Sequence, residues 1–182
     1  GTPGVPLVES EQDGTVAFTS DGRFLVVGTT GPTEVVDVGS GQIVQRLSSA
    51  DRELQDSVNP IAVAGDHVVV GTNVATTGGV SAYVDVWNAD TWTREAVLTP
   101  ISGTVVTSVG ISADGEKVAV GNADGTGGIW SRETKERLVT LAGQTAVLGT
   151  ITFSPDAKTV ATASNDGTAR IYRAKPPARV TV

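Results

Sequence analysis

The chain has one His, no Cys and scattered acidic residues, and these side chains do not stand at catalytic spacings. Its single histidine, His67, follows Asp66, and such a pair is part of a hydrolytic triad. A triad also needs a nucleophile within hydrogen-bond reach of the imidazole, and no nucleophile motif accompanies the pair. We therefore interpret His67 as a surface or turn residue at the start of a strand, and the sequence predicts no catalytic residue.

Metal and cofactor sites also lack support in the sequence. The chain has no Cys and one His, which excludes disulfides, thiolate zinc sites and histidine clusters. The Asp-Gly pairs at Asp114, Asp124 and Asp166 lack the alternating oxygen ligands and distal Glu of a calcium loop. The stretch 73–81 contains Gly but lacks the Gly-Lys-Ser/Thr ending of a phosphate-binding loop. The sequence predicts no metal and no cofactor.

Composition narrows the class of partner. The 182 residues carry a net charge of −7 and a pI near 4.6, which argues against general nucleic-acid binding because phosphate contacts need a basic surface. No apolar run approaches the roughly 20 residues that span a bilayer, so we expect no membrane partner. The N-terminus shows no secretory signal, so we expect a cytoplasmic location. The chain contains no Met, so we interpret Gly1 as a residue of a processed or longer chain.

The elements that position these side chains come from an internal repeat. Three stretches combine a Ser or Thr, an Asp two residues later and an alternating apolar run, and a fourth stretch is a more divergent copy. A fixed period of this length is typical of modular repeat folds. Strict alternation predicts short strands, and the Asp-Gly pairs predict tight reversals between them. The sequence therefore predicts an all-β protein, and the repeats are at 17–22, 59–66, 110–115 and 152–157.

Several residues recur at corresponding places in these copies. The third predicted strand ends on an aromatic residue in three copies, at Trp87, Trp130 and Tyr172, while Asp124 and Asp166 stand in the preceding turns. On these residues the chain resembles the WD-repeat β-propeller family, in a divergent, bacterial-type form. The resemblance implies four four-stranded antiparallel blades and an interaction function. A different bacterial propeller family with Ser-X-Asp-Gly turns remains the alternative, and the aligned Trp residues count against it.

The family's Gly-His pair before the first strand occurs here only as Gly143-Gln144. The histidine that the resemblance implies for a hydrogen-bond tetrad is therefore missing throughout. We expect each blade to lose a polar tie that contributes about 1 kcal/mol.

The repeats divide the chain into five units. We expect a longer connection at 48–59 and a flexible surface loop in the insertion of blade 2, because spacings there exceed those of the other copies. The predicted units are an N-terminal strand or junction segment at 1–14, blade 1 at 15–57, blade 2 at 58–100 with its insertion at 73–81, blade 3 at 101–143, and blade 4 with a C-terminal strand at 144–182.

The two enlargements predict a partner-binding face. In the family that this chain resembles, the connection between blades and the loop between second and third strands open on the same face. Trp92 stands outside the aromatic register and is therefore a further contact candidate. We expect this face to bind a protein or peptide through Asp51, Arg52, Glu53, Asp56, Thr76, Thr77 and Trp92.

Four blades leave two end faces uncovered, because each blade buries its faces against neighbours. We expect half of a larger ring, with eight blades if a second copy completes it; the remaining blades of a parent protein are the alternative partner. Opposite charges at the chain's two ends favour a head-to-tail junction. Strands are also expected at 5–9 and 179–182. The predicted junction residues are Glu9, Glu11 and Asp13 at one end and Arg170, Arg173 and Arg179 at the other.

The leading functional hypothesis is a non-enzymatic scaffold that assembles with a second set of blades. Two other hypotheses stay open: a regulatory or sensor fragment at the C-terminus of a larger signalling protein, and a propeller enzyme, a hydrolase or lyase, with a site in the central channel. An engineered or truncated array without a function of its own is also compatible with the sequence.

Overall fold

The computed structural model describes residues 14–29, 31–47, 59–77, 79–98 and 104–175. These residues form 15 strands in four antiparallel sheets, and in each sheet the strands follow one another in chain order. The all-β prediction is confirmed. Within the described ranges no helix is long and apolar enough to cross a membrane.

Each sheet is one blade. Blade 1 contains β1 (Thr15–Phe18), β2 (Phe24–Gly28), β3 (Thr33–Asp37) and β4 (Gln42–Leu47); blade 2 contains β5 (Ile61–Ala64), β6 (His67–Thr76), β7 (Gly79–Asn88) and β8 (Arg94–Leu98). Blade 3 contains β9 (Val106–Ile111), β10 (Lys117–Asn122), β11 (Gly127–Ser131) and β12 (Arg137–Leu141); blade 4 contains β13 (Leu148–Phe153), β14 (Thr159–Ser164) and β15 (Ala169–Arg173).

Blade 4 has three strands among the described residues, whereas the other blades have four. The strand predicted at 179–182 lies outside the described part of the chain, as does the one predicted at 5–9. In the part that is described, β15 is therefore the outermost strand of its sheet.

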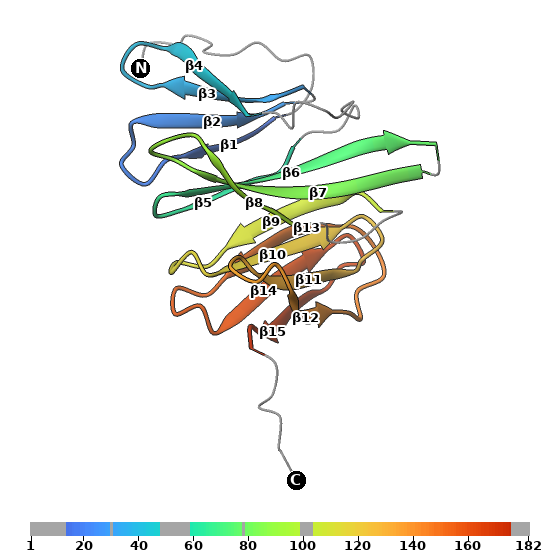
Figure 1. Cartoon of the computed structure of the whole chain (residues 1–182). Helices are drawn as coiled ribbons and strands as arrows, with labels where there is room; N and C mark the ends of the chain where they lie inside the picture. The colour runs from blue at the N-terminus through green and yellow to red at the C-terminus, as the bar shows by residue number, and fades with distance from the viewer. Residues whose placement is uncertain (1–13, 30, 48–58, 78, 99–103, 176–182) are drawn as a thin grey trace, which may run out of the picture.

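The blades stack side by side in chain order (Figure 1). The first strand of each blade contacts the first strand of the next, through β1–β5, β5–β9 and β9–β13. The buried apolar side chains accordingly form three clusters, one at each junction, instead of a single central core. Trp87 and Trp130 each lie in the cluster that faces the preceding blade, and Tyr172 packs against the third cluster.

The insertion of blade 2 is a paired hairpin, so the expectation of a flexible loop there is wrong. β6 and β7 pair without interruption from His67 opposite Asn88 to Thr76 opposite Gly79. The inner part of this extension is buried because Val74 packs inward and Asn73 reaches blade 3. The Asn73 side chain donates to the Val106 carbonyl at 3.0 Å and accepts from the Val106 N–H at 2.8 Å, in the manner of a strand partner.

The predicted turn chemistry is present. Asp124 and Asp166 each accept hydrogen bonds from the backbone N–H and hydroxyl of a Thr two residues later. The glycines that follow them, Gly125 and Gly167, have φ of 84° and 83°, a region that glycine adopts without steric cost. These bonds explain why Asp-Gly recurs at this turn.

Candidate interaction surfaces

The face of each blade that points toward the next blade has one apolar position at the centre of its third strand. Val35, Val86 and Ile129 occupy this position in blades 1 to 3, and each is 0% exposed. In blade 4 the same position is Ile171, which is 76% exposed. The outward face of blade 4 therefore presents the residue that every internal junction covers.

The outward face of blade 1 shows the complementary pattern. Val16 and Phe18 on β1 are 64% and 59% exposed, and they point away from blade 2. The corresponding residues on β9 are Val109 and Ile111, which are 7% and 8% exposed because blade 2 covers them. The two end faces are thus the two halves of a junction that occurs three times within the chain.

A second position records how closely neighbouring blades approach. The second strands of blades 1 to 3 each carry a glycine that faces the first strand of the next blade. A Cβ added at Gly28 would lie 3.0 Å from Ile61, one at Gly71 would lie 2.9 Å from Val106, and one at Gly121 would lie 2.8 Å from Leu148. The corresponding residue of blade 4 is Ala163, whose side chain is exposed. The end face therefore carries a methyl group where the internal junctions carry none.

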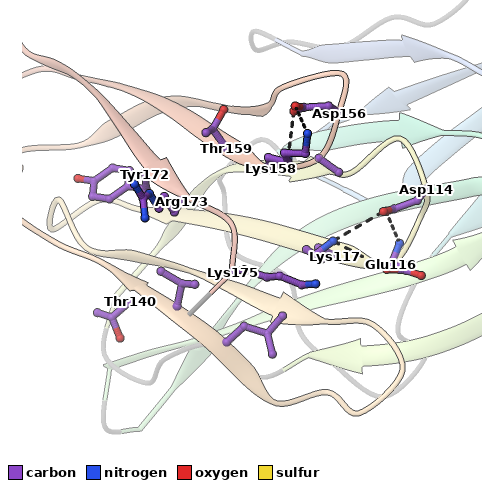
Figure 2. A pocket seen from close by; sticks show the side chains of 13 residues that line it. Asp114, Glu116, Lys117, Thr140, Asp156, Lys158, Thr159, Tyr172, Arg173 and Lys175 are labelled. Atoms are coloured by element: carbon purple, nitrogen blue, oxygen red, sulfur yellow. Dashed lines mark hydrogen bonds and ion pairs between the residues drawn. The ribbon is translucent and has the colours of Figure 1, made fainter. Parts of the chain in front are cut away.

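A groove with a volume of about 1190 Å³ lies between blades 3 and 4 (Figure 2). One wall is the outer strand β12, through Leu138, Val139 and Thr140, and the other is Tyr172 on β15. The Tyr172 hydroxyl donates to the Ala142 carbonyl at 3.0 Å, which ties the two blades together beside the groove.

Charged side chains line one end of this groove. Lys117 lies 3.6 Å from Asp114, and Lys158 lies 3.3 Å from Asp156. Hydrogen bonds from the Ser112 and Ser154 hydroxyls lower the pKa of these two aspartates, so both are ionised at neutral pH. No described carboxylate lies within ion-pair distance of the two remaining cations, Arg173 and Lys175.

The predicted partner-binding residues do not all share one face. Thr76 and Thr77 are exposed at the tip of the β6–β7 hairpin, whereas Trp92 lies in the β7–β8 turn. These two turns stand at opposite ends of the ten-residue strand β7, which at about 3.3 Å per residue separates them by roughly 30 Å. The other predicted residues, Asp51, Arg52, Glu53 and Asp56, lie outside the described residues.

Trp92 is half-buried and takes part in a junction between blades. Its ring meets Phe24 of blade 1 edge to face, with the centroids 5.4 Å apart. Its φ is 54°, because the turn requires a left-handed residue at this point. The position outside the aromatic register is therefore explained by the turn and by packing against Phe24.

Of the predicted ring-junction residues, the structure describes two, both near the C-terminal end of the chain. Arg170 and Arg173 are exposed on β15, while Glu9, Glu11, Asp13 and Arg179 lie outside the described ranges. The Arg170 guanidinium lies beside Gly143, where an added Cβ would be 2.8 Å from Nη1. Arg170 thus leans toward blade 3, and the electrostatic junction stays a prediction.

His67 is buried, so its interpretation as a surface or turn residue is wrong. Its Nδ1 lies 2.7 Å from Asp66 and its Nε2 lies 3.2 Å from Glu95. Glu95 also lies 3.2 Å from Arg132, whose Nε donates to the Gly115 carbonyl in blade 3. The imidazole is therefore part of a polar link between blades 2 and 3. The sequence did not indicate this link because Glu95 and Arg132 lie far from His67 along the chain.

Gln144 supplies the polar tie that was expected to be lost at the last blade. It is 5% exposed and accepts a hydrogen bond from the Thr162 hydroxyl at 2.6 Å. Its Nε2 donates to the Thr168 carbonyl at 2.9 Å. A glutamine amide can bridge a donor and an acceptor as an imidazole does. The expectation that each blade loses this tie is therefore wrong for blade 4.

Comparison with known proteins identifies the repeats. The family model described as "WD domain, G-beta repeat" matches residues 94–131 and 135–173. Each match begins at the outer strand of one blade, β8 or β12, and ends with the third strand of the next. The chain is also similar to Protein HIR1 of Phaeosphaeria nodorum, with 27% identity over 168 residues that cover 89% of this chain and 11% of that protein. The chain therefore spans about a tenth of the length of this relative.

Proposed function

We propose that this chain, which matches the WD-domain family model at residues 94–131 and 135–173, is a non-enzymatic interaction scaffold that closes a ring with a second set of blades. WD repeats mediate protein–protein interaction, and this is the general function of the chain. The observation that carries the finer proposal is the pair of end faces. Each exposes, at Val16, Phe18 and Ile171, positions that the internal junctions bury.

A second copy of the chain is the simplest occupant of these faces. Its blade 1 can cover Ile171 of the first copy, and its own blade 4 can receive Val16 and Phe18 of the first copy. A twofold axis relates two such junctions, so two chains satisfy all four end faces. Burying apolar side chains of this size contributes about 1.5–3 kcal/mol each.

Of the two enlarged segments that predict a partner-binding face, the structure describes the β6–β7 hairpin. Thr76 and Thr77 are held there by a fully paired strand extension, which makes this tip a rigid projection. We assign protein or peptide binding to this projection together with residues 51–56, because loops on a rigid scaffold commonly carry recognition.

The length of the relative favours a second candidate. Because the chain matches 11% of Protein HIR1, these blades can also be part of a longer regulatory protein. In that case further blades of the same protein cover the end faces, and the isolated chain stays monomeric.

The proposal is tested by the substitution Ile171→Asp, with Val38→Asp as the matched control. Both residues are exposed, at 76% and 42%, but Val38 lies in the β3–β4 turn, away from the end face. We expect Ile171→Asp to raise the dissociation constant for self-association at least tenfold and Val38→Asp to leave it unchanged. A folded Ile171→Asp chain with unaltered self-association would refute the proposed junction.

A further inference from the structure

A one-residue bulge interrupts the pairing between the third and outer strands in blades 1, 2 and 3. The outer-strand residues that the bulges leave without an opposite residue on the third strand are Val44, Glu95 and Leu138. A bulge re-aims the side chain that it carries. All three side chains lie at the junction with the next blade: Glu95 is 3.2 Å from Arg132 of blade 3, and Val44 and Leu138 line cavities.

A second equivalent position directly follows the third strand of each later blade. Ala89, Arg132 and Ala174 occupy it in blades 2, 3 and 4. In each case the backbone N–H donates to the carbonyl of the residue that precedes the second strand, at 2.7, 2.9 and 2.8 Å. The shared hydrogen bond places the three residues at the same point of the fold, so their side chains can be compared directly.

At the junction between blades 2 and 3, an ion pair joins these two positions. The Arg132 Nη1 lies 3.2 Å from the Glu95 carboxylate, and the Arg132 Nε donates to the Gly115 carbonyl at 2.8 Å. The side chains of Arg132 and Glu95 are 31% and 30% exposed. This junction therefore shows a guanidinium that lies between two blades and pairs with a carboxylate.

The junction between blades 1 and 2 has Val44 and Ala89 at the same two positions, and these residues cannot form an ion pair. A cavity with a volume of about 450 Å³ lies there, between β4 and the β7–β8 turn, and we call it the first-junction cleft. Its apolar wall consists of Val44, which is 49% exposed, together with Phe24 and Trp92. The junction between blades 3 and 4, which also has alanine at the second position, has the groove described above.

Carboxylates line the rim of the first-junction cleft. The Thr19 hydroxyl lowers the pKa of Asp21, and the Ser40 N–H lowers the pKa of Asp37, so both carboxyls are ionised at neutral pH. Asp90 is the third carboxylate of the lining, and it is exposed.

One cation lies among these carboxylates. The Arg23 Nε is 3.9 Å from Asp37, and the Arg23 guanidinium lies over the Phe24 ring, 4.7 Å from the ring centre. One guanidinium against three carboxylates leaves a formal charge of −2 on the lining. The contact with Phe24 also shows that an aromatic face of this cleft accepts a guanidinium. The cleft therefore suits a further cation that carries an apolar stem.

We propose that the first-junction cleft binds an arginine side chain of a partner protein, as Arg132 of the chain itself occupies the next junction. The aliphatic stem of that arginine packs on Val44 and Trp92, and its guanidinium pairs with Asp37 and Asp90. Arginine is favoured over lysine because its planar head pairs with carboxylates through two hydrogen bonds and stacks on aromatic rings. This inference rests on the proposed interaction function but not on the ring, because the described lining belongs to blades 1 and 2 of one chain.

Titration of the full chain with short peptides, followed by NMR, tests the site. The probe has seven residues, with one arginine between glycine and serine residues, and two matched probes carry citrulline or lysine in its place. We expect the arginine probe to shift the indole N–H signal of Trp92 in a saturable manner. The signals of Trp87 and Trp130, which are 9% and 3% exposed, should stay in place. The absence of a Trp92 shift up to roughly 10 mM probe would overturn the proposal.

The matched probes separate charge from shape. Citrulline keeps the planar head of arginine without its charge, so its dissociation constant should be at least about tenfold higher. The dissociation constant of the lysine probe should be at least about threefold higher, because an ammonium group cannot pair in a bidentate manner. Equal affinities for arginine and citrulline overturn the recognition of a cation. Equal affinities for arginine and lysine overturn the assignment to arginine.

Removal of two charges from the rim tests which carboxylates bind the probe. Asp37→Asn retains the turn, because Asn88 at the equivalent place of blade 2 accepts the same N–H hydrogen bond. Together with Asp90→Asn it should raise the dissociation constant of the arginine probe at least about tenfold. The matched control, Glu133→Gln with Glu136→Gln, removes the same charge from the corresponding turn of blade 3 and should leave the constant unchanged. Equal effects in the two double variants overturn the site, because net charge alone would then explain binding.

Two further variants change the cleft in opposite directions. Arg23→Gln removes the competing guanidinium, so the arginine probe should bind several-fold more tightly. Val44→Glu with Ala89→Arg gives this junction the ion pair of the next one, so the probe should bind at least about tenfold more weakly. An unchanged affinity in either folded variant contradicts the assigned site.

Light scattering on the same samples separates this proposal from the assembly. A chain that keeps the mass of one copy and binds the arginine probe supports the cleft and overturns the ring. A dimer mass without a Trp92 shift overturns the cleft and leaves the ring intact. A single-chain mass without a shift overturns both.

Discussion

Ile129 and Ile171 occupy the same position on neighbouring blades, yet Ile129 is fully buried and Ile171 is 76% exposed. The difference lies in the neighbour: blade 4 covers Ile129, and no described residue covers Ile171 to the same extent. A repeat protein buries its apolar faces between adjacent units, so an uncovered unit at each end offers a surface for a further unit.

The glycine at the inner junctions predicts a measurable difference between two similar substitutions. In Gly121→Ala the new Cβ would lie 2.5 Å from the Ser108 hydroxyl and 2.8 Å from Leu148 Cβ, so the free energy of unfolding should fall by about 1–3 kcal/mol. In Ala163→Gly, at the equivalent position of the open face, self-association should tighten because a neighbour can approach more closely. Chemical denaturation and light scattering measure the two effects. A Gly121→Ala chain as stable as the parent would contradict the close approach of blades 3 and 4.

Gln144 predicts a stability change at the last blade. Gln144→Ala leaves the buried Thr162 hydroxyl without its acceptor and the Thr168 carbonyl without one of its donors, so we expect a loss of about 1–3 kcal/mol in chemical denaturation. Gln144→His should retain much of the stability, since an imidazole can replace the amide. The control Gln45→Ala, at an exposed position, should change it by less than about 0.5 kcal/mol. Equal losses in the two alanine variants would remove Gln144 from this role.

Asp166 predicts a pH dependence with a definite sign. The Thr168 hydroxyl and the Thr145 N–H lower the pKa of this carboxyl to about 2, below its ordinary value of 3.8. A lowered folded-state pKa means that ionised Asp166 stabilises the fold above pH 3.8 and that this contribution is lost as the pH falls toward 2. The parent should therefore exceed Asp166→Asn in stability at pH 6, and the gap should close toward pH 2.

Denaturation of both chains at pH 6, 4 and 2.5 measures this gap. Thr168→Val removes the hydroxyl that contributes most to the lowered pKa of Asp166. The difference in stability between the parent and Thr168→Val should therefore also shrink from pH 6 to pH 2.5. A gap between the parent and Asp166→Asn that widens on acidification would contradict the assigned hydrogen bonds.

The repeat, the tight turns and the aromatic positions could be predicted from the sequence because each depends on residues close together in the chain. Alternation predicts strands locally, and Asp166-Gly167 carries its own turn chemistry. The register of Trp87, Trp130 and Tyr172 likewise follows from the period of the repeat.

Features that depend on partners distant in the sequence could not be predicted. His67 contacts Glu95 on β8, and Glu95 in turn contacts Arg132 in the β11–β12 turn; both lie far from His67 in the sequence. Gln144 replaces a histidine through contacts with Thr162. The length of the β6–β7 hairpin escaped prediction because small residues in the insertion suggested a loop. The packing of Trp92 against Phe24 of blade 1 is likewise a contact between residues far apart in the chain.

The central claim is that the two end faces bind each other in a second copy. The most direct test is the mass of the purified chain by light scattering over a dilution series. The account predicts a species of twice 18.5 kDa that dissociates on dilution. A folded chain that keeps the mass of one copy at every concentration would contradict it.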